Sequence, residues 1–138
     1  MNIIQQFSGL ANDRLPKVIT PKGHAVADYL VAAGAFIAAF AFFKSGRKAA
    51  GIGALITGAV QVLNPMITDF PGGVFDVIDF PTHGRVDMGA NSMAASMPQV
   101  LGLHDGESKF FYIHAGIGLA VTAMTDYNRN GQAASQTA

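Results

Sequence analysis

The feature that most constrains this chain is a duplication, in which two long apolar segments carry the same polar residues at both ends. The first segment covers residues 21–70 and the second covers residues 81–127. Each begins with a histidine and an aspartate four residues apart, and each ends with threonine, aspartate and an aromatic residue. The shared ionisable residues are His24, Asp28 and Asp69 in the first segment and His83, Asp87 and Asp126 in the second. This pattern predicts two tandem copies of one helical hairpin.

The apolar runs inside the two segments are long enough to cross a bilayer. They cover Ala25–Phe43, Ala49–Thr68, Met88–Leu103 and Phe110–Thr125. A helix rises about 1.5 Å per residue, so the longer runs reach about 28–30 Å, close to the thickness of the hydrocarbon core. A soluble four-helix bundle is the alternative, but its helices would each need a charged outer face, and only 13% of the residues are charged. We therefore expect an all-α fold: a four-helix transmembrane bundle of two tandem hairpins, related by a pseudo-two-fold axis.

The residues outside the two segments are expected at the membrane surface or in solvent. Residues 1–20 place several apolar side chains on one helical face, which predicts a short amphipathic helix on the membrane surface, with a frayed tail as the alternative. The connector 71–80 is expected at the interface, and the polar tail 128–138 is expected to be disordered. Lysine and arginine are five to four in favour of the side with the termini, which predicts cytoplasmic termini.

Composition excludes several classes of function. The chain has no cysteine, so disulfides, zinc ribbons and thiol nucleophiles are excluded. Its formal net charge is zero and it has no basic stripe, which argues against nucleic acid as a partner. It also lacks a phosphate loop, a dinucleotide fingerprint and a nucleophile elbow. No set of residues predicts an enzyme, and the expected partner is the lipid bilayer.

The six shared ionisable residues are expected to gather at one end of the bundle. In an antiparallel hairpin the start of one helix lies beside the end of the next, so His24 and Asp28 should share a membrane face with Asp69. The same reasoning applies to the second segment, and residues four apart lie on one helical face. Three interpretations stay open: a lock that holds each hairpin in register, a path for ions or protons, and a site for a divalent metal or haem.

One further histidine, His114, lies inside the fourth apolar run. We expect it to be a hydrogen-bonded core residue near Ser96 or Met97, and the alternative is a ligand. The imidazoles available to a metal or a haem iron are those of His24, His83 and His114. Small residues in the second and fourth runs predict close helix contacts, either inside the bundle or in a homo-oligomer.

Motifs in three stretches are similar to those of a known family. The stretches are Thr68–Gly72, Asp79–His83 and Ser96–Gly102, with Asp87 between the last two. They resemble the SPW-repeat group of bacterial integral membrane proteins, over about residues 21–127. The resemblance implies paired membrane helices, a His-x-x-x-Asp at a helix start and a location in the bacterial inner membrane. The chain departs from the family in having no tryptophan and in the residue that separates serine from proline in the third stretch.

Together these features predict a small integral membrane protein of non-enzymatic role. It would be a structural or accessory component, or a subunit of a larger membrane complex. One alternative is a small transporter or an ion- or proton-binding protein that uses the histidine and aspartate cluster. Another is a membrane protein that binds haem or a metal through the same histidines.

Overall fold

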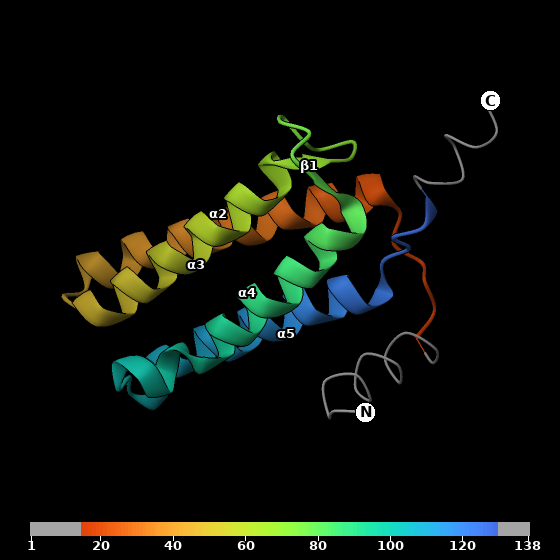
Figure 1. The fold of residues 1–138 in the computed structure, drawn as a ribbon. Helices are drawn as coiled ribbons and strands as arrows, with labels where there is room; N and C mark the ends of the chain where they lie inside the picture. Colours follow the sequence, from red (N-terminus) through yellow and green to blue (C-terminus); the bar gives the residue numbers. More distant parts are fainter. Residues whose placement is uncertain (1–14, 130–138) are drawn as a thin grey trace, which may run out of the picture.

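The computed structural model describes residues 15–129, and these are helical apart from two very short strands and the connecting loops, so the all-α prediction is confirmed. The four helices are α2 (Pro21–Lys44), α3 (Lys48–Met66), α4 (Phe80–Leu101) and α5 (Asp105–Met124). Figure 1 shows two antiparallel hairpins side by side, α2 with α3 and α4 with α5, with both hairpin turns at the same end. The starts of α2 and α4 therefore lie together at the opposite end.

The first helix begins where its sequence indicates. Thr20 is the N-cap of α2, and its side-chain oxygen accepts a hydrogen bond of 3.1 Å from the amide of Gly23. Pro21 follows at the first helical position, where its missing N–H costs nothing. The helix ends at Lys44, one residue beyond the predicted apolar run, and Gly46 makes the turn into α3 with a φ of 75°.

The starts of α4 and α5 lie further upstream than the apolar runs suggested. α4 begins at Phe80 because Asp79 caps it, accepting a hydrogen bond of 2.7 Å from the amide of Thr82. Hydrogen bonds from Thr82 hold the pKa of the Asp79 carboxyl below its usual value of 3.8. α5 begins at Asp105, where Glu107 reaches back to the amide of His104 at 3.3 Å. The extra turns are polar, so hydrophobicity alone did not reveal them.

Short stretches of extended chain join the helix ends at the end of the bundle opposite the hairpin turns. Strand β1 (Thr68–Asp69) follows α3 and pairs in parallel with strand β2 (Ile78–Asp79), which precedes α4. A single bridge between Ile19 and Thr125 joins the chain before α2 to the chain after α5 in the same parallel sense. These pairings hold the starts of α2 and α4 beside the ends of α5 and α3.

The helices pack in a square in which sequence neighbours lie side by side. α2 and α4 each contact both α3 and α5, so α2 and α4 face each other across the bundle axis. Near the hairpin turns the axis is filled by a core of apolar side chains: Ala39, Ala50, Ala54, Met97 and Phe111. Small residues allow this close approach, because a methyl group on Gly53 or Gly58 would press against side chains of neighbouring helices.

The outer surface of the bundle is largely apolar. On α2, Leu30, Ile37 and Phe40 are each at least two-thirds exposed, and only 17% of the helix's most apolar window is buried. Within the described part of the chain, α2 and α3 are long and apolar enough to cross a membrane by length and composition. α4 and α5 are not, because polar first turns and interior polar residues lower their hydropathy. The predicted membrane character is thus supported for one hairpin.

The predicted flanking segments fall mostly outside the described residues. Of the segment 1–20, only residues 15–20 are described, and these form no helix. Of the tail 128–138, only residues 128–129 are described. The connector 71–80 forms a loop that ends in strand β2, and its last residue belongs to α4.

Candidate metal centre

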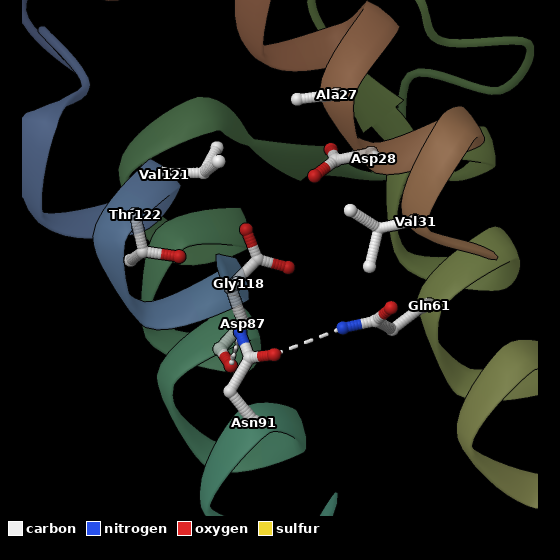
Figure 2. A pocket seen from close by; sticks show the side chains of 9 residues that line it. All are labelled: Ala27, Asp28, Val31, Gln61, Asp87, Asn91, Gly118, Val121 and Thr122. Atoms are coloured by element: carbon white, nitrogen blue, oxygen red, sulfur yellow. Dashed lines mark hydrogen bonds between the residues drawn. The ribbon is translucent and has the colours of Figure 1, made fainter. Parts of the chain in front are cut away.

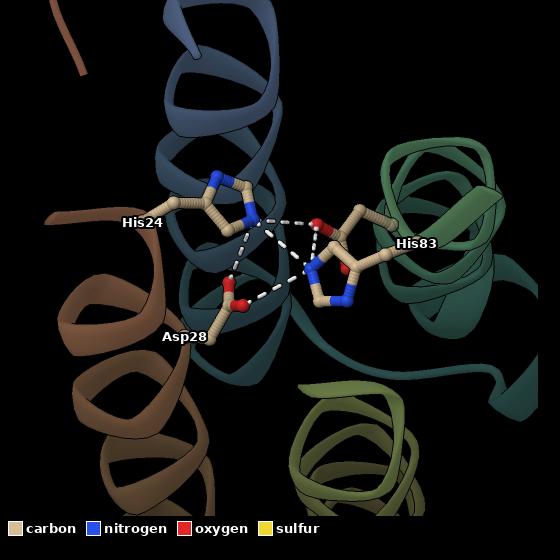
Figure 3. Close-up of side chains that lie close together, drawn as sticks. His24, Asp28 and His83 are labelled. Carbon is tan, nitrogen blue, oxygen red and sulfur yellow. Dashed lines mark hydrogen bonds and ion pairs between the residues drawn. The ribbon is translucent and has the colours of Figure 1, made fainter. Parts of the chain in front are cut away.

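Four ionisable side chains meet on the bundle axis near the starts of α2 and α4. His24 and Asp28 lie one turn apart on α2, and His83 and Asp87 lie one turn apart on α4. Both imidazoles are completely buried, and the carboxylate side chains are 12% and 9% exposed for Asp28 and Asp87. Figure 3 shows His24 and His83 pointing toward each other, with Asp28 below them. We call these four residues the His/Asp cluster.

The atoms that face each other are those that bind metals. The two Nε2 atoms of the histidines are 3.0 Å apart, and both lie 3.0 Å from Oδ2 of Asp87. Asp28 offers one oxygen 3.3 Å from His24 Nε2 and its other oxygen 3.1 Å from His83 Nε2. One ligand atom from each residue can be chosen so that all four lie within 4.8 Å of one another.

Two threonines fix which nitrogen of each histidine carries the proton. Thr125 Oγ1 lies 2.7 Å from Nδ1 of His24, and Thr68 Oγ1 lies 2.9 Å from Nδ1 of His83. Each hydroxyl donates its own hydrogen to a helix carbonyl, that of Val121 or that of Asn64, both at 2.6 Å. A hydroxyl has only one hydrogen, so toward the imidazole it must accept. Both Nδ1 atoms therefore carry hydrogen, and in the neutral ring both Nε2 atoms are bare lone pairs.

The cluster consequently gathers four acceptors and no donor at its centre. Two lone pairs and two carboxylates repel one another unless a cation lies between them, either an added proton or a metal ion. One oxygen of Asp87 is already satisfied, because Asn64 Nδ2 donates to Oδ1 at 2.7 Å and leaves Oδ2 for the centre. Oδ2 of Asp28 is buried and accepts no hydrogen bond. Such an unpartnered buried oxygen is costly without a positive partner.

The spacing of the four acceptors suits a small divalent ion. Zinc bound to imidazole and carboxylate has bonds of about 2.0–2.2 Å, and tetrahedral ligands at that radius lie about 3.4 Å from one another. The five separations between the Nε2 atoms and their neighbours in the cluster, 3.0–3.3 Å, are slightly shorter and need only small shifts. The threonine contacts also match known metal sites, in which a ligating histidine donates its other N–H to a fixed acceptor.

A haem does not fit between these histidines. Two axial imidazoles on one iron would need their Nε2 atoms about 4 Å apart with a porphyrin ring between them. Here the two Nε2 atoms are 3.0 Å apart and the carboxylates of Asp28 and Asp87 fill the space around them. Of the two cofactor predictions, the geometry therefore favours the metal ion.

Aromatic rings close the cluster on the side of the bundle end. Phe80 lies 5.4 Å from the ring of His24 and 5.7 Å from that of His83, and Phe70 stacks on Phe80. Tyr127 completes the cover, with its ring 5.6 Å from His24. Burial raises the pKa of the Tyr127 phenol, and the charge of Asp87 raises it further. This cover excludes water and strengthens any electrostatic interaction inside it.

Two of the six predicted cluster residues lie elsewhere. Asp69 is exposed, and Asp126 is half-buried and accepts a hydrogen bond from the amide of Asn128. In both Thr-Asp pairs it is the threonine that reaches the cluster, and not the aspartate expected from the sequence. Alternate residues of an extended chain point to opposite faces, so Thr68 points inward and Asp69 outward. The repeated Thr-Asp-aromatic motif is the feature of the sequence that points to these two threonines.

His114 lies outside the cluster, in a separate hydrogen-bonded group. Its Nε2 contacts Oε1 of Gln61 at 2.9 Å, and Gln61 Nε2 donates to Oδ1 of Asn91 at 3.0 Å. Asn91 in turn donates to the backbone carbonyl of Asp87. The expected hydrogen-bonded core histidine is confirmed, and its partner is Gln61 on α3 rather than Ser96 or Met97 on α4. His114 is therefore not placed to share a metal with the other two histidines.

Comparisons with known proteins add no family to this description. No family model matches the chain, and neither a curated protein nor a solved structure is significantly similar to it.

Proposed function

We propose that this chain is a four-span membrane protein that binds a single divalent transition-metal ion in the His/Asp cluster. The observation that carries the proposal is the convergence of four acceptor atoms, two from carboxylates and two from histidines. Both histidines are held with hydrogen on Nδ1, which leaves Nε2 free to bind a metal. Imidazole suits zinc, iron, nickel and copper, whereas a site for magnesium or calcium would be built from oxygen alone. Zinc is the simplest fit to two nitrogens and two carboxylates.

The membrane part of the proposal rests on the shape of the whole bundle. α4 and α5 have 22 and 20 residues and lie alongside α2 and α3, so a bilayer around the first hairpin would surround the second. Exposed Ile113 and Ile117 on α5 are compatible with lipid. The matching contacts of Thr68 with His83 and of Thr125 with His24 favour a pseudo-two-fold relation between the hairpins. Both described chain ends lie at the cluster end, which we place at the cytoplasmic side.

The metal would join the two hairpins rather than serve a conduction path. The cluster links α2 and α4 across the bundle axis, and in the described part of the chain the buried side-chain hydrogen bonds between helices extend only as far as His114. Beyond His114 the axis is filled by the apolar core around Phe111. A continuous path for ions would need polar groups or water through that region. A binding role in an accessory membrane protein, alone or in a larger complex, is therefore favoured over transport.

A proton-sharing cluster is the second candidate. The 3.0 Å contact between the two Nε2 atoms can also be bridged by one added proton, which would make the cluster a purely structural lock between the hairpins. The two candidates differ in whether the cluster takes up metal. They share the same neighbours and the same burial, so a binding measurement is needed to separate them.

Competition titration separates the two candidates. Purified protein in detergent is stripped with a chelator, and zinc is then added in the presence of a chromophoric competitor. We expect one tight zinc site per chain, which His83→Gln and Asp87→Asn each weaken strongly. His114→Gln is the matched control, since it alters another buried histidine outside the cluster, and it should bind as wild type does. Equal zinc affinity in wild type and His83→Gln would refute the proposed metal site and leave the structural lock.

A further inference from the structure

A small cavity adjoins the His/Asp cluster on the side away from the aromatic rings. It lies between α2 and α5, is partly open to the outside, and has a volume of about 10 Å³. Figure 2 shows Asp28 and Asp87 bordering the cavity, with Gln61 and Asn91 at one side and Thr122 at another. Both carboxylates of the cluster thus border the cavity on one side and the histidines on the other.

The size and lining of the cavity suit a single water molecule. A cavity of about 10–15 Å³ holds one water if two to four polar groups line it. Here the polar groups are the two carboxylates, the two side-chain amides and the hydroxyl of Thr122. Gln61 donates one side-chain N–H to Asn91, and Asn91 donates one side-chain N–H to the carbonyl of Asp87. Each side-chain amide therefore has a second N–H that can donate to a water molecule. The remaining wall is apolar, from Val31 on α2 and Val121 on α5.

We infer that the metal keeps an exchangeable coordination position on this side, filled by water and open to small anionic ligands. The inference rests on the proposed metal site. The ligands from Asp28 and Asp87 border both the cluster and the cavity, so an ion held between them lies at the cavity wall. The opposite side is closed by Phe80 and Tyr127, so it offers no such position. Zinc-type ions accept a fifth ligand when the site leaves room for one.

The cavity also restricts which ligands reach the metal. Apart from Asp28 and Thr122, the residues of α2 and α5 that line the cavity are small or apolar, and the volume admits only the donor atom of a ligand and a narrow remainder of the molecule. A slender anion such as azide can place its donor nitrogen on the metal and its other end toward the opening. A bulky chelating anion cannot enter without separating the two helices. The ligand class is therefore a small monodentate anion or water, held beside the free N–H groups of the amides.

Cobalt loading makes this position visible. Cobalt(II) replaces zinc in such sites, and its visible absorption bands change when the number or kind of ligands changes. Chelator-treated wild-type protein in detergent is loaded with cobalt and titrated with azide. We expect visible bands on loading and a saturable change in these bands with azide. Val31→Phe, which fills the cavity, should keep the cobalt bands and lose the azide response.

Two comparisons complete the design. Leu30→Phe adds the same ring at the neighbouring position, which is 67% exposed, and should respond to azide as wild type does. Val121→Phe fills the cavity from α5 and replaces Val31→Phe if that variant does not fold. Cobalt bands in wild type that azide leaves unchanged would overturn the inference and leave the metal site standing. An azide response that persists in the filled variants would also overturn it. Absence of any cobalt bands would overturn the metal site itself, and the inference with it.

Discussion

The hydrogen bonds from the two histidines to threonine are the most informative contacts to break. Thr68 and Thr125 are buried to 0% and 1% exposure, and each accepts the Nδ1–H of one histidine. Valine has nearly the same shape as threonine but no hydroxyl, so Thr68→Val leaves the Nδ1–H of His83 without an acceptor. The ring then gains by moving its proton to Nε2, which is the atom needed for the metal. The substitution therefore weakens metal binding without removing a ligand.

The expected size follows from the cost of the lost partner. An orphaned buried N–H costs about 1–3 kcal/mol. Removing a group that orients a metal ligand typically lowers affinity by about 10–100-fold. This range equals about 1.4–2.8 kcal/mol, in agreement with the first value. Thr125→Val should lower the zinc affinity by a similar factor, because Thr125 accepts the Nδ1–H of His24 in the same way. The two hydrogen bonds have similar lengths, 2.7 Å for Thr125 and 2.9 Å for Thr68.

The assay is the competition titration with zinc, applied to paired variants. Thr68→Ser keeps the hydroxyl and serves as the control, so its affinity should stay near that of wild type. Circular dichroism of each variant verifies that the helices persist. If Thr68→Val binds zinc as tightly as wild type, Thr68 does not hold the hydrogen of His83 on Nδ1, and the proposed metal centre loses its main support.

Three further predictions concern helix packing, stability in acid and the stabilisation of the fold by bound zinc. Gly118→Ala should destabilise the bundle by about 1–3 kcal/mol in chemical unfolding, because the added methyl would overlap the side chain of Asn91. Since hydrogen bonds with Thr82 lower the pKa of Asp79, its cap stabilises the fold above pH 3.8, and this contribution is lost as the pH falls through the lowered value. Asp79→Asn should therefore show a weaker loss of stability below pH 4 than wild type in acid titrations followed by circular dichroism. Zinc at about 100 times its dissociation constant should stabilise wild type by about 2.7 kcal/mol, seen as a higher melting temperature, and should leave Asp87→Asn unchanged.

The sequence was sufficient to place the two histidines and the two nearby aspartates together. Spacing of four puts His24 with Asp28 on one helical face, and it does the same for His83 with Asp87. Two hairpins in tandem also bring both helix starts to one end of the bundle. These are short-range regularities of helix geometry, and the structure retains them.

Contacts across the bundle axis could not be predicted in the same way. Thr125 reaches His24 across 101 residues, and Gln61 reaches His114 from a helix that is not its hairpin partner. Such pairs depend on the rotation of each helix about its own axis, which hydrophobic runs do not fix when the whole surface is apolar. The prediction that Asp69, rather than Thr68, joins the cluster was wrong for a related reason. In extended chain a shift of one residue turns a side chain from one face to the other.

The most direct test of the metal centre is X-ray absorption at the zinc edge of protein loaded with one equivalent of zinc. We expect a shell of nitrogen and oxygen at about 2.0–2.1 Å, with outer scattering from two imidazole rings. In His83→Gln the imidazole scattering should fall to that of one ring. A zinc shell of oxygen alone, without imidazole scattering, would contradict metal binding by His24 and His83.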